Sequence, residues 1–95
     1  MPASPRILVI DDEAAIRDAL RMILEYEHYE FTGASSGADG IAMIRRDRPD
    51  AVLLDIKMAG MDGLDVLRAI RAFDEALPVV MISGHATMAT ADEAI

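Results

Sequence analysis

The sequence predicts an α/β fold, a doubly wound parallel sheet with helices on both of its faces. Three short segments, residues 7–10, 51–54 and 79–82, are apolar without alternation. Strands of this kind are typically buried on both faces, as in a parallel sheet that helices cover. Segments with the helical period of apolar residues lie between them, so we expect consecutive βα units with right-handed crossovers.

A further strand is expected near residues 29–32, where Tyr29-Glu30-Phe31-Thr32 alternates in polarity. Because alternation is typical of a strand with one solvated face, we place this strand at the edge of the sheet. A strand order of 2-1-3-4, numbered along the chain, agrees with this placement and is the one we adopt.

Three helices are predicted from apolar stripes and from the residues that begin and end them. The second begins at Ser36 and stops before Pro49, and the third begins at Asp62 and stops before Pro78. A fourth helical segment begins near residues 87–90. The residues expected to face the core are Ile16, Ala19, Leu20, Ile23 and Leu24 in the first helix, Ala38, Ile41, Ala42 and Ile44 in the second, and Val66, Leu67, Ile70 and Phe73 in the third.

Composition is typical of one soluble domain. The 95 residues are 53% hydrophobic and 27% charged, with a net charge of −8 and no cysteine. The acidic balance disfavours direct binding of nucleic acid or of an anionic membrane. No apolar run approaches the roughly 20 residues of a membrane helix, and the lack of cysteine suits a reducing compartment, so we expect a cytoplasmic protein. Residues 1–5 are expected to form a loose tail and residues 6–95 the domain.

Acidic residues follow two of the predicted strands. Asp11 and Asp12 come directly after residues 7–10, and Asp55 comes directly after residues 51–54. The carboxyl ends of parallel strands lie along one edge of the sheet, and ligands bind there at the point where the strand order reverses. In the order 2-1-3-4 this point falls between strands 1 and 3, so the three carboxylates are expected to converge.

Three converging carboxylates raise one another's pKa and require a compensating charge. Oxygen ligands without histidine or cysteine favour a hard cation such as Mg²⁺. The arrangement suits phosphoryl transfer, in which a carboxylate nucleophile forms an acyl phosphate. Asp55 is the favoured nucleophile because it ends a central strand alone and precedes an open loop, residues 56–63, while Asp11 and Asp12 form the metal side.

Three motifs together resemble the receiver domain of two-component response regulators: residues 7–12, the loop Asp55-Ile56-Lys57-Met58-Ala59-Gly60-Met61-Asp62-Gly63, and residues 79–86. The resemblance covers residues 6–95 and implies a flavodoxin-like sheet. It also implies that a sensor histidine kinase phosphorylates Asp55 in a Mg²⁺-dependent reaction. The domain would then control an output domain or partner protein outside this chain. Residues 83–95 look most like receivers of enhancer-binding transcription activators.

The resemblance assigns roles to individual residues. Asp12 would bind Mg²⁺ directly and Asp11 mainly through water, with Asp55 and the backbone carbonyl of Lys57 as further ligands. Ser83 would be the switch hydroxyl that moves to bond the phosphoryl group. Catalysis by the domain would be limited to its own phosphorylation and dephosphorylation.

The chain departs from the family's pattern in two ways. Ala59 stands where the family usually has a proline. The family's essential lysine, at the end of a fifth strand, has no counterpart, because Lys57 is the one lysine here and its side chain is expected to point to solvent. The fifth strand and last helix are also missing, so an exposed fourth strand is expected to promote a homodimer or a swapped assembly.

Other interpretations compete with a phosphoacceptor. Without the lysine the domain could be a non-switching interaction module or an inactive fragment. A haloacid-dehalogenase-like phosphatase would need an acid two residues after its nucleophile, and Lys57 at that position argues against it. Asp12 could instead cap the first helix, while Asp62 and Asp65 are better explained as a helix cap and a first-turn acid. Residues 45–48 are expected to be a basic helix end, not a nucleic-acid site.

Overall fold

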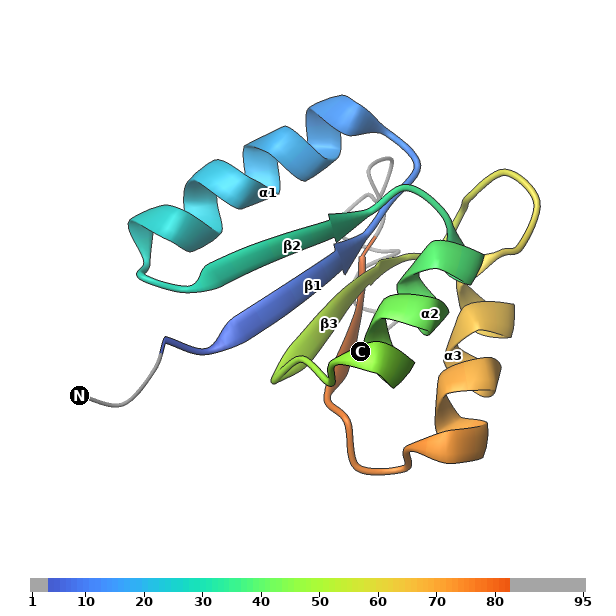
Figure 1. Ribbon diagram of the computed structural model, residues 1–95. Coiled ribbons are helices and arrows are strands. Elements are labelled where there is room, and N and C mark those ends of the chain that lie inside the picture. Colours follow the sequence, from blue (N-terminus) through green and yellow to red (C-terminus); the bar gives the residue numbers. More distant parts are fainter. Residues whose placement is uncertain (1–3, 83–95) are drawn as a thin grey trace.

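Four parallel strands alternate with three helices in the part of the chain that the structure, a computed structural model, describes, residues 4–82 (Figure 1). The strands pair in the order β2-β1-β3-β4, as predicted. Ser83 and the expected fourth helix lie outside the described residues. The elements are β1 (Arg6–Ile10), α1 (Ala14–Tyr26), β2 (Glu30–Ala34), α2 (Gly37–Arg46), β3 (Ala51–Asp55), α3 (Gly63–Phe73) and β4 (Val79–Ile82).

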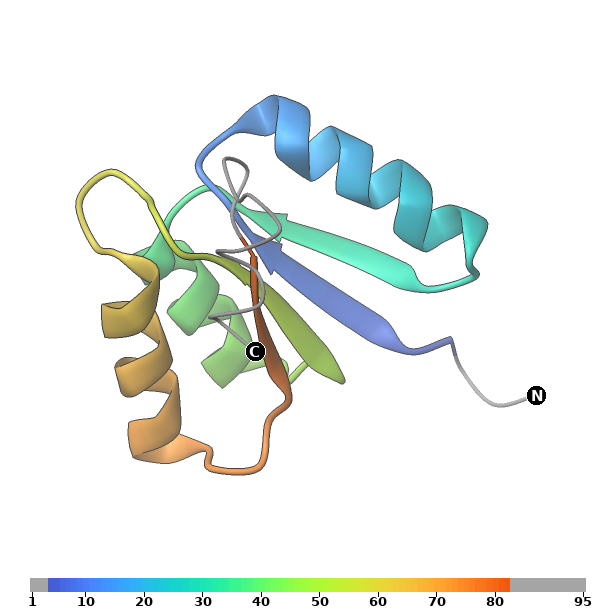
Figure 2. The same cartoon turned by 180° about the vertical axis from the view of Figure 1, so that it is seen from behind.

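Helices cover both faces of the sheet, but unequally. Helices α2 and α3 lie side by side on one face, and α1 lies on the other (Figures 1 and 2). The larger core forms beneath α2 and α3, where alternate side chains of the strands meet the two helices. Its buried residues are Leu8, Ile10, Ala34, Ile44, Val52, Leu54, Val66, Ile70 and Leu77.

The buried face of α2 differs from the predicted one. Ala38 and Ala42 are exposed, whereas Gly37, Gly40 and Ile44 are buried. A Cβ at Gly40 would overlap the side chain of Ile10, and one at Gly37 would overlap that of Val66. The two glycines therefore let α2 approach β1 and α3 closely, a contact that counting apolar side chains misses.

The apolar stripe of α1 is less buried than predicted. None of its residues is fully buried, and Ile23 is 59% exposed. Helix α1 packs against β1 and β2, and among residues 4–82 no second helix lies beside it on that face. One helix on an open face covers the sheet with one side only, so the flanks of its stripe stay exposed.

Strand β4 is likewise not buried on both faces, which corrects the prediction from its apolar run. Val79 and Met81 pack against the core beneath α2 and α3, but Val80 is 53% exposed. Val80 pairs in register with Leu53, on the face where α1 covers only β1 and β2. The prediction holds for β1, where residues 7–10 are all buried.

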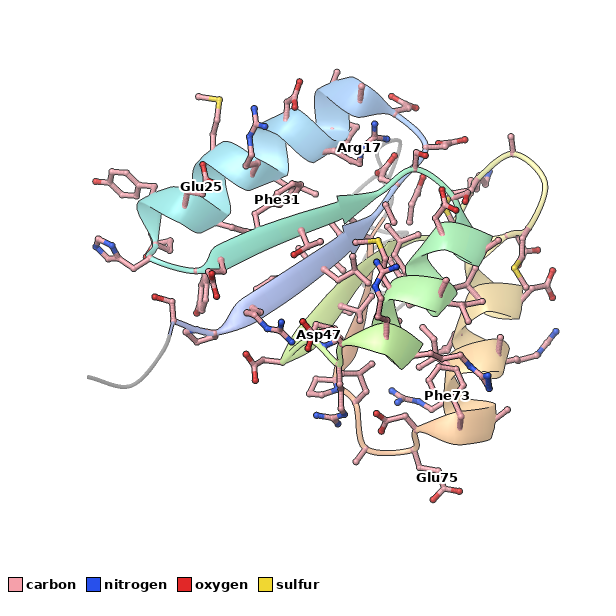
Figure 3. All side chains as sticks on the ribbon, in the orientation of Figure 1. Arg17, Glu25, Phe31, Asp47, Phe73 and Glu75 are labelled. Atoms are coloured by element: carbon pink, nitrogen blue, oxygen red, sulfur yellow. The ribbon has the colours of Figure 1, made fainter. Side chains whose placement is uncertain are left out.

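The ends of α2 and α3 follow the sequence signals. The side chains of Ser36 and Asp62 cap the two helices, as expected. The basic end of α2 makes intramolecular contacts: Arg45 lies over the ring of Phe73, 4.5 Å from its centroid (Figure 3), and Arg48, just beyond the helix, pairs with Asp74. Among residues 4–82, no helix has the length and hydropathy to cross a bilayer.

Candidate functional site

Three carboxylates meet at the carboxyl edge of the sheet, where the strand order reverses. Asp11 and Asp12 follow β1, and Asp55 is the last residue of β3. One oxygen from each of the three lies within 4.8 Å of the others. Strands β1 and β3 are hydrogen-bonded neighbours whose crossovers run to opposite faces of the sheet, so residues far apart in sequence come together here.

Asp11 is fully buried, and its two carboxylate oxygens differ in their hydrogen bonding. Oδ1 accepts a hydrogen bond from the backbone N–H of Glu13 at 2.9 Å, while Oδ2 has no partner among the described residues. Burial raises the pKa of Asp11, and the carboxylates of Asp12 and Glu13 raise it further. A buried carboxylate oxygen without a partner is unfavourable unless a proton or a cation compensates it.

Asp55 is 4% exposed and sits at the end of a central strand. Burial raises the pKa of its carboxyl group, and the nearby carboxylate of Asp11 raises it further. The backbone N–H of Lys57 opposes this shift by donating to Oδ1 of Asp55 at 3.3 Å. Asp55 thus combines a desolvated carboxylate with an adjoining acidic partner, a combination that makes it a candidate site residue.

Asp12 is exposed, in contrast to the other two acids. Its Oδ2 accepts a hydrogen bond from the backbone N–H of Ala59 at 3.0 Å. This bond joins the loop after β1 to the loop after β3. The structure shows no side-chain cap from Asp12 at the start of α1, where Glu13 occupies the N-cap position. The helix-cap interpretation of Asp12 is therefore wrong.

The loop after Asp55 is held at its far end by the start of α3. Oδ1 of Asp62 accepts a hydrogen bond from the N–H of Asp65 at 3.0 Å, so these residues form a helix cap and first turn as expected. The N–H of Gly63 donates to the carbonyl of Ile56 at 2.8 Å. A Cβ at Gly63 would overlap the carbonyl oxygen of Asp55, so glycine lets α3 begin directly against the backbone of this residue.

Lys57 contributes its backbone to the site and not its amine. The residue is exposed, while its N–H points to Asp55. The side chain is thus solvent-facing, as the sequence predicts for a loop position.

Arg17 is a neighbour of the site that the sequence interpretation missed. Its guanidinium donates to the backbone carbonyl of Asp11 at 2.6 Å, and its positive charge offsets a small part of the rise that burial causes in the pKa of Asp11. The residue lies near the start of α1, at the carboxyl edge of the sheet (Figure 3). Its spacing of six residues from Asp11 is the available signal, because it places the side chain on the first helical turns after the strand.

Two cavities lie elsewhere. One, of about 140 Å³, is lined by residues of β1, β2 and α2 that include Arg6 and Asp47. The other, of about 310 Å³, lies between the end of β2 and α2 and includes Asp39. Neither lining includes Asp11 or Asp55.

The fold and this site define the class of the protein: a doubly wound α/β domain with an acidic cluster at the point where its strand order reverses. Residues 7–95 match the response regulator receiver domain family, and the chain belongs to that family.

Curated relatives agree with this assignment. The chain is 39% identical over 80 residues to the response regulator MprA of Mycobacterium leprae, covering 84% of this chain and 35% of that protein. It is 40% identical over 82 residues to MprA of Mycobacterium tuberculosis, covering 86% of this chain and 36% of that protein. The chain thus spans about a third of the length of these relatives.

Solved structures of response regulators also superpose on this chain. NtrX from Brucella abortus, solved in complex with ATP, superposes with a TM-score of 0.84 at 42% identity, over 96% of this chain and 21% of NtrX. The N-terminal domain of a response regulator receiver protein from Methanoculleus marisnigri superposes with a TM-score of 0.82 at 35% identity, over 94% of this chain and 75% of that one. The chemotaxis protein CheY4 of Vibrio cholerae gives 0.83 at 25% identity, over 96% and 78%.

Proposed function

We propose that this chain is the phosphoacceptor module of a two-component phosphorelay, with Asp55 as the residue that receives the phosphoryl group. The observation that carries the proposal is the position of Asp55: a buried carboxylate at the end of a central strand, next to Asp11, whose Oδ2 is buried and has no partner among residues 4–82. The donor would be the phosphohistidine of a sensor histidine kinase.

The carboxylate cluster fits Mg²⁺. Its donors are all oxygens. Burial, followed by repulsion from neighbouring carboxylates, raises the pKa of Asp11 and of Asp55, and a divalent cation would offset both effects. Asp11, Asp12, Asp55 and the backbone carbonyl of Lys57 would hold the ion. When bound, Mg²⁺ supplies positive charge next to the transferred phosphoryl group.

Asp55 supplies the nucleophile. One of its carboxylate oxygens forms a bond to phosphorus as the P–N bond of the phosphohistidine breaks, and the electron pair of that bond stays on the imidazole nitrogen. The product is an acyl phosphate on Asp55. Ser83, through its hydroxyl, would then bond the phosphoryl oxygens. Catalysis by the chain is limited to this phosphorylation and the later hydrolysis.

The phosphorylated domain would control an output domain or partner protein outside this chain, in transcription. The names of the relatives support a regulatory role, and the enhancer-binding subtype suggested by residues 83–95 stays a prediction. A net charge of −8 argues that DNA contacts are made elsewhere than in this segment. A cytoplasmic setting, where a sensor kinase presents its phosphohistidine, is part of the proposal.

The proposal is tested by the intact mass of the chain after incubation with acetyl phosphate and Mg²⁺. The parent is expected to gain one phosphoryl group, and Asp55→Asn none. Asp65→Asn is the matched control, because it neutralises an exposed acid at the start of α3, outside the cluster. It is expected to react like the parent.

Two outcomes would contradict the proposal. A phosphoryl gain in Asp55→Asn would place the acceptor elsewhere. An unmodified parent that nevertheless binds Mg²⁺ in calorimetry would favour the alternative of a non-switching interaction module, because the metal site would then exist without phosphoryl transfer.

A further inference from the structure

The loop after β3 turns two of its backbone amides toward the acidic cluster. The N–H of Lys57 donates to Oδ1 of Asp55 at 3.3 Å, and the N–H of Ala59 donates to Oδ2 of Asp12 at 3.0 Å. These two carboxylates come from different strands, 43 residues apart along the chain, so the loop bridges the site. The loop itself is fixed at its far end by the bond from Gly63 to Ile56.

The bond from Ala59 affects the one acid that packing does not hold. Asp11 and Asp55 are buried, which restricts their side chains, whereas Asp12 is exposed and would otherwise sample several rotamers. The same structure that contains this bond has one oxygen of each acid within 4.8 Å of the others. The bond is thus compatible with three carboxylates that converge on one ion.

We propose that the backbone amide of Ala59 is a positioning group for the metal site: it holds the carboxylate of Asp12 toward Asp11 and Asp55 and so tightens Mg²⁺ binding. This inference rests on the proposed function, because it requires that the cluster bind Mg²⁺. A second observation, independent of the bond from Ala59, also indicates a cation site: Oδ2 of Asp11 is buried and has no partner among the described residues. Hydrogen bonds that orient metal ligands commonly contribute tenfold or more to affinity.

The residue type at position 59 affects the bond to Asp12 only by having or lacking a backbone N–H. Every residue except proline has the N–H that this bond requires. Proline also fixes φ at about −65°, so a variant that removes the N–H without this constraint is needed beside Ala59→Pro. Ala59→Pro therefore removes the donor, while Ala59→Ser keeps both the donor and the β-carbon.

The first experiment measures the Mg²⁺ dissociation constant of the full chain by calorimetry. We expect Ala59→Ser to match the parent within about twofold and Ala59→Pro to bind about tenfold more weakly. A second variant controls for distortion of the loop by proline. It contains lactic acid in place of Ala59, introduced by chemical synthesis of the chain, so that only the N–H is replaced, by an oxygen. It is expected to weaken binding in the same direction as proline.

Hydrogen exchange tests the bond itself without metal. The amide of Ala59 is expected to exchange several-fold faster in Asp12→Ala than in the parent, while an amide of α3 such as Ile70 serves as the reference. Equal exchange at residue 59 in both proteins would overturn the proposal.

The binding results separate two failures. A parent that does not bind Mg²⁺ would refute the metal site of the proposed function, and the role of Ala59 with it. A parent that binds, together with a lactic acid variant of equal or higher affinity, would refute the role of Ala59 alone. Weaker binding by Ala59→Pro without weaker binding by the lactic acid variant would count as loop distortion and would also overturn it.

Discussion

Asp11 and Asp55 lie at the ends of neighbouring parallel strands and are the two charged residues buried in the part of the chain that the structure describes. Burial raises the pKa of each, and the carboxylate of Asp11 raises the pKa of Asp55 further. The strand pairing of β1 with β3 enforces this proximity. The site thus holds two acids whose ionised forms disfavour the folded, metal-free chain.

Neutralising Asp55 is expected to stabilise the metal-free chain at neutral pH. A carboxyl group whose pKa is raised on folding costs nothing well below its unfolded value of 3.8; its cost grows as pH rises from there toward the folded value and is complete above it. Asp55→Asn should therefore increase the free energy of unfolding at pH 7 by about 0.5–2 kcal/mol. Urea unfolding without Mg²⁺ measures this difference.

The pH dependence of the free energy of unfolding shows whether charge causes the stabilisation by Asp55→Asn. The difference between Asp55→Asn and the parent should shrink toward zero as pH falls to 3.8 and below, since the acid is then protonated in both states. Asp65→Asn, at an exposed position outside the cluster, is the matched control for loss of a carboxylate. A gain that is constant between pH 3 and pH 7 would mean that packing, and not charge, is responsible.

Gly63→Ala is expected to destabilise the chain more than Gly40→Ala. An added Cβ at Gly63 would meet the backbone of Asp55 and Ile56, which cannot move without displacing the end of β3. At Gly40 it would meet Cδ1 and Cγ1 of the buried Ile10 side chain and not backbone, and alanine favours the helix interior over glycine by about 1 kcal/mol. We expect a cost of about 1–3 kcal/mol at Gly63. Chemical denaturation of both variants ranks them, and an equal or reversed ranking would contradict the contact at Asp55.

The exposed face of β4 is expected to promote self-association. Val80 is 53% exposed, and the outer edge of β4 pairs with no strand among residues 4–82. Sedimentation velocity should show a concentration-dependent rise in mean mass for the parent, and Val80→Lys should reduce it. Arg68→Lys, which retains charge on an exposed part of α3, is the control. A parent that sediments as a monomer at all concentrations would contradict this expectation.

Much of the architecture is predictable from the pattern of residues. Unbroken apolar runs, alternation near Tyr29 and the caps at Ser36 and Asp62 identify the strands, the edge strand and the starts of two helices. Once the strand order is taken as 2-1-3-4, the meeting of Asp11 with Asp55 follows from the rule that parallel strands end along one edge of the sheet. These features are local or topological, so no knowledge of particular contacts is needed.

Burial was less predictable than the elements themselves. The inward face of α2 contains Gly37 and Gly40, which have no apolar side chain to count, and Ala38 and Ala42 face solvent instead. Val80 is apolar yet exposed, because the helix on its face of the sheet covers other strands. Which apolar residue is buried depends on what packs against it.

Residue type alone predicts the parallel sheet, its edge strand and the acids that follow two of its strands, because the hydrophobic period and the polarity of each strand can be read from the sequence. The folded chain adds two features that residue type does not reveal: Oδ2 of Asp11 has no partner among residues 4–82, and the N–H of Ala59 binds Asp12. The N–H of Ala59 belongs to the backbone and is the same in almost every residue. Its role arises from the path of the loop after β3, which residue type at position 59 does not reveal.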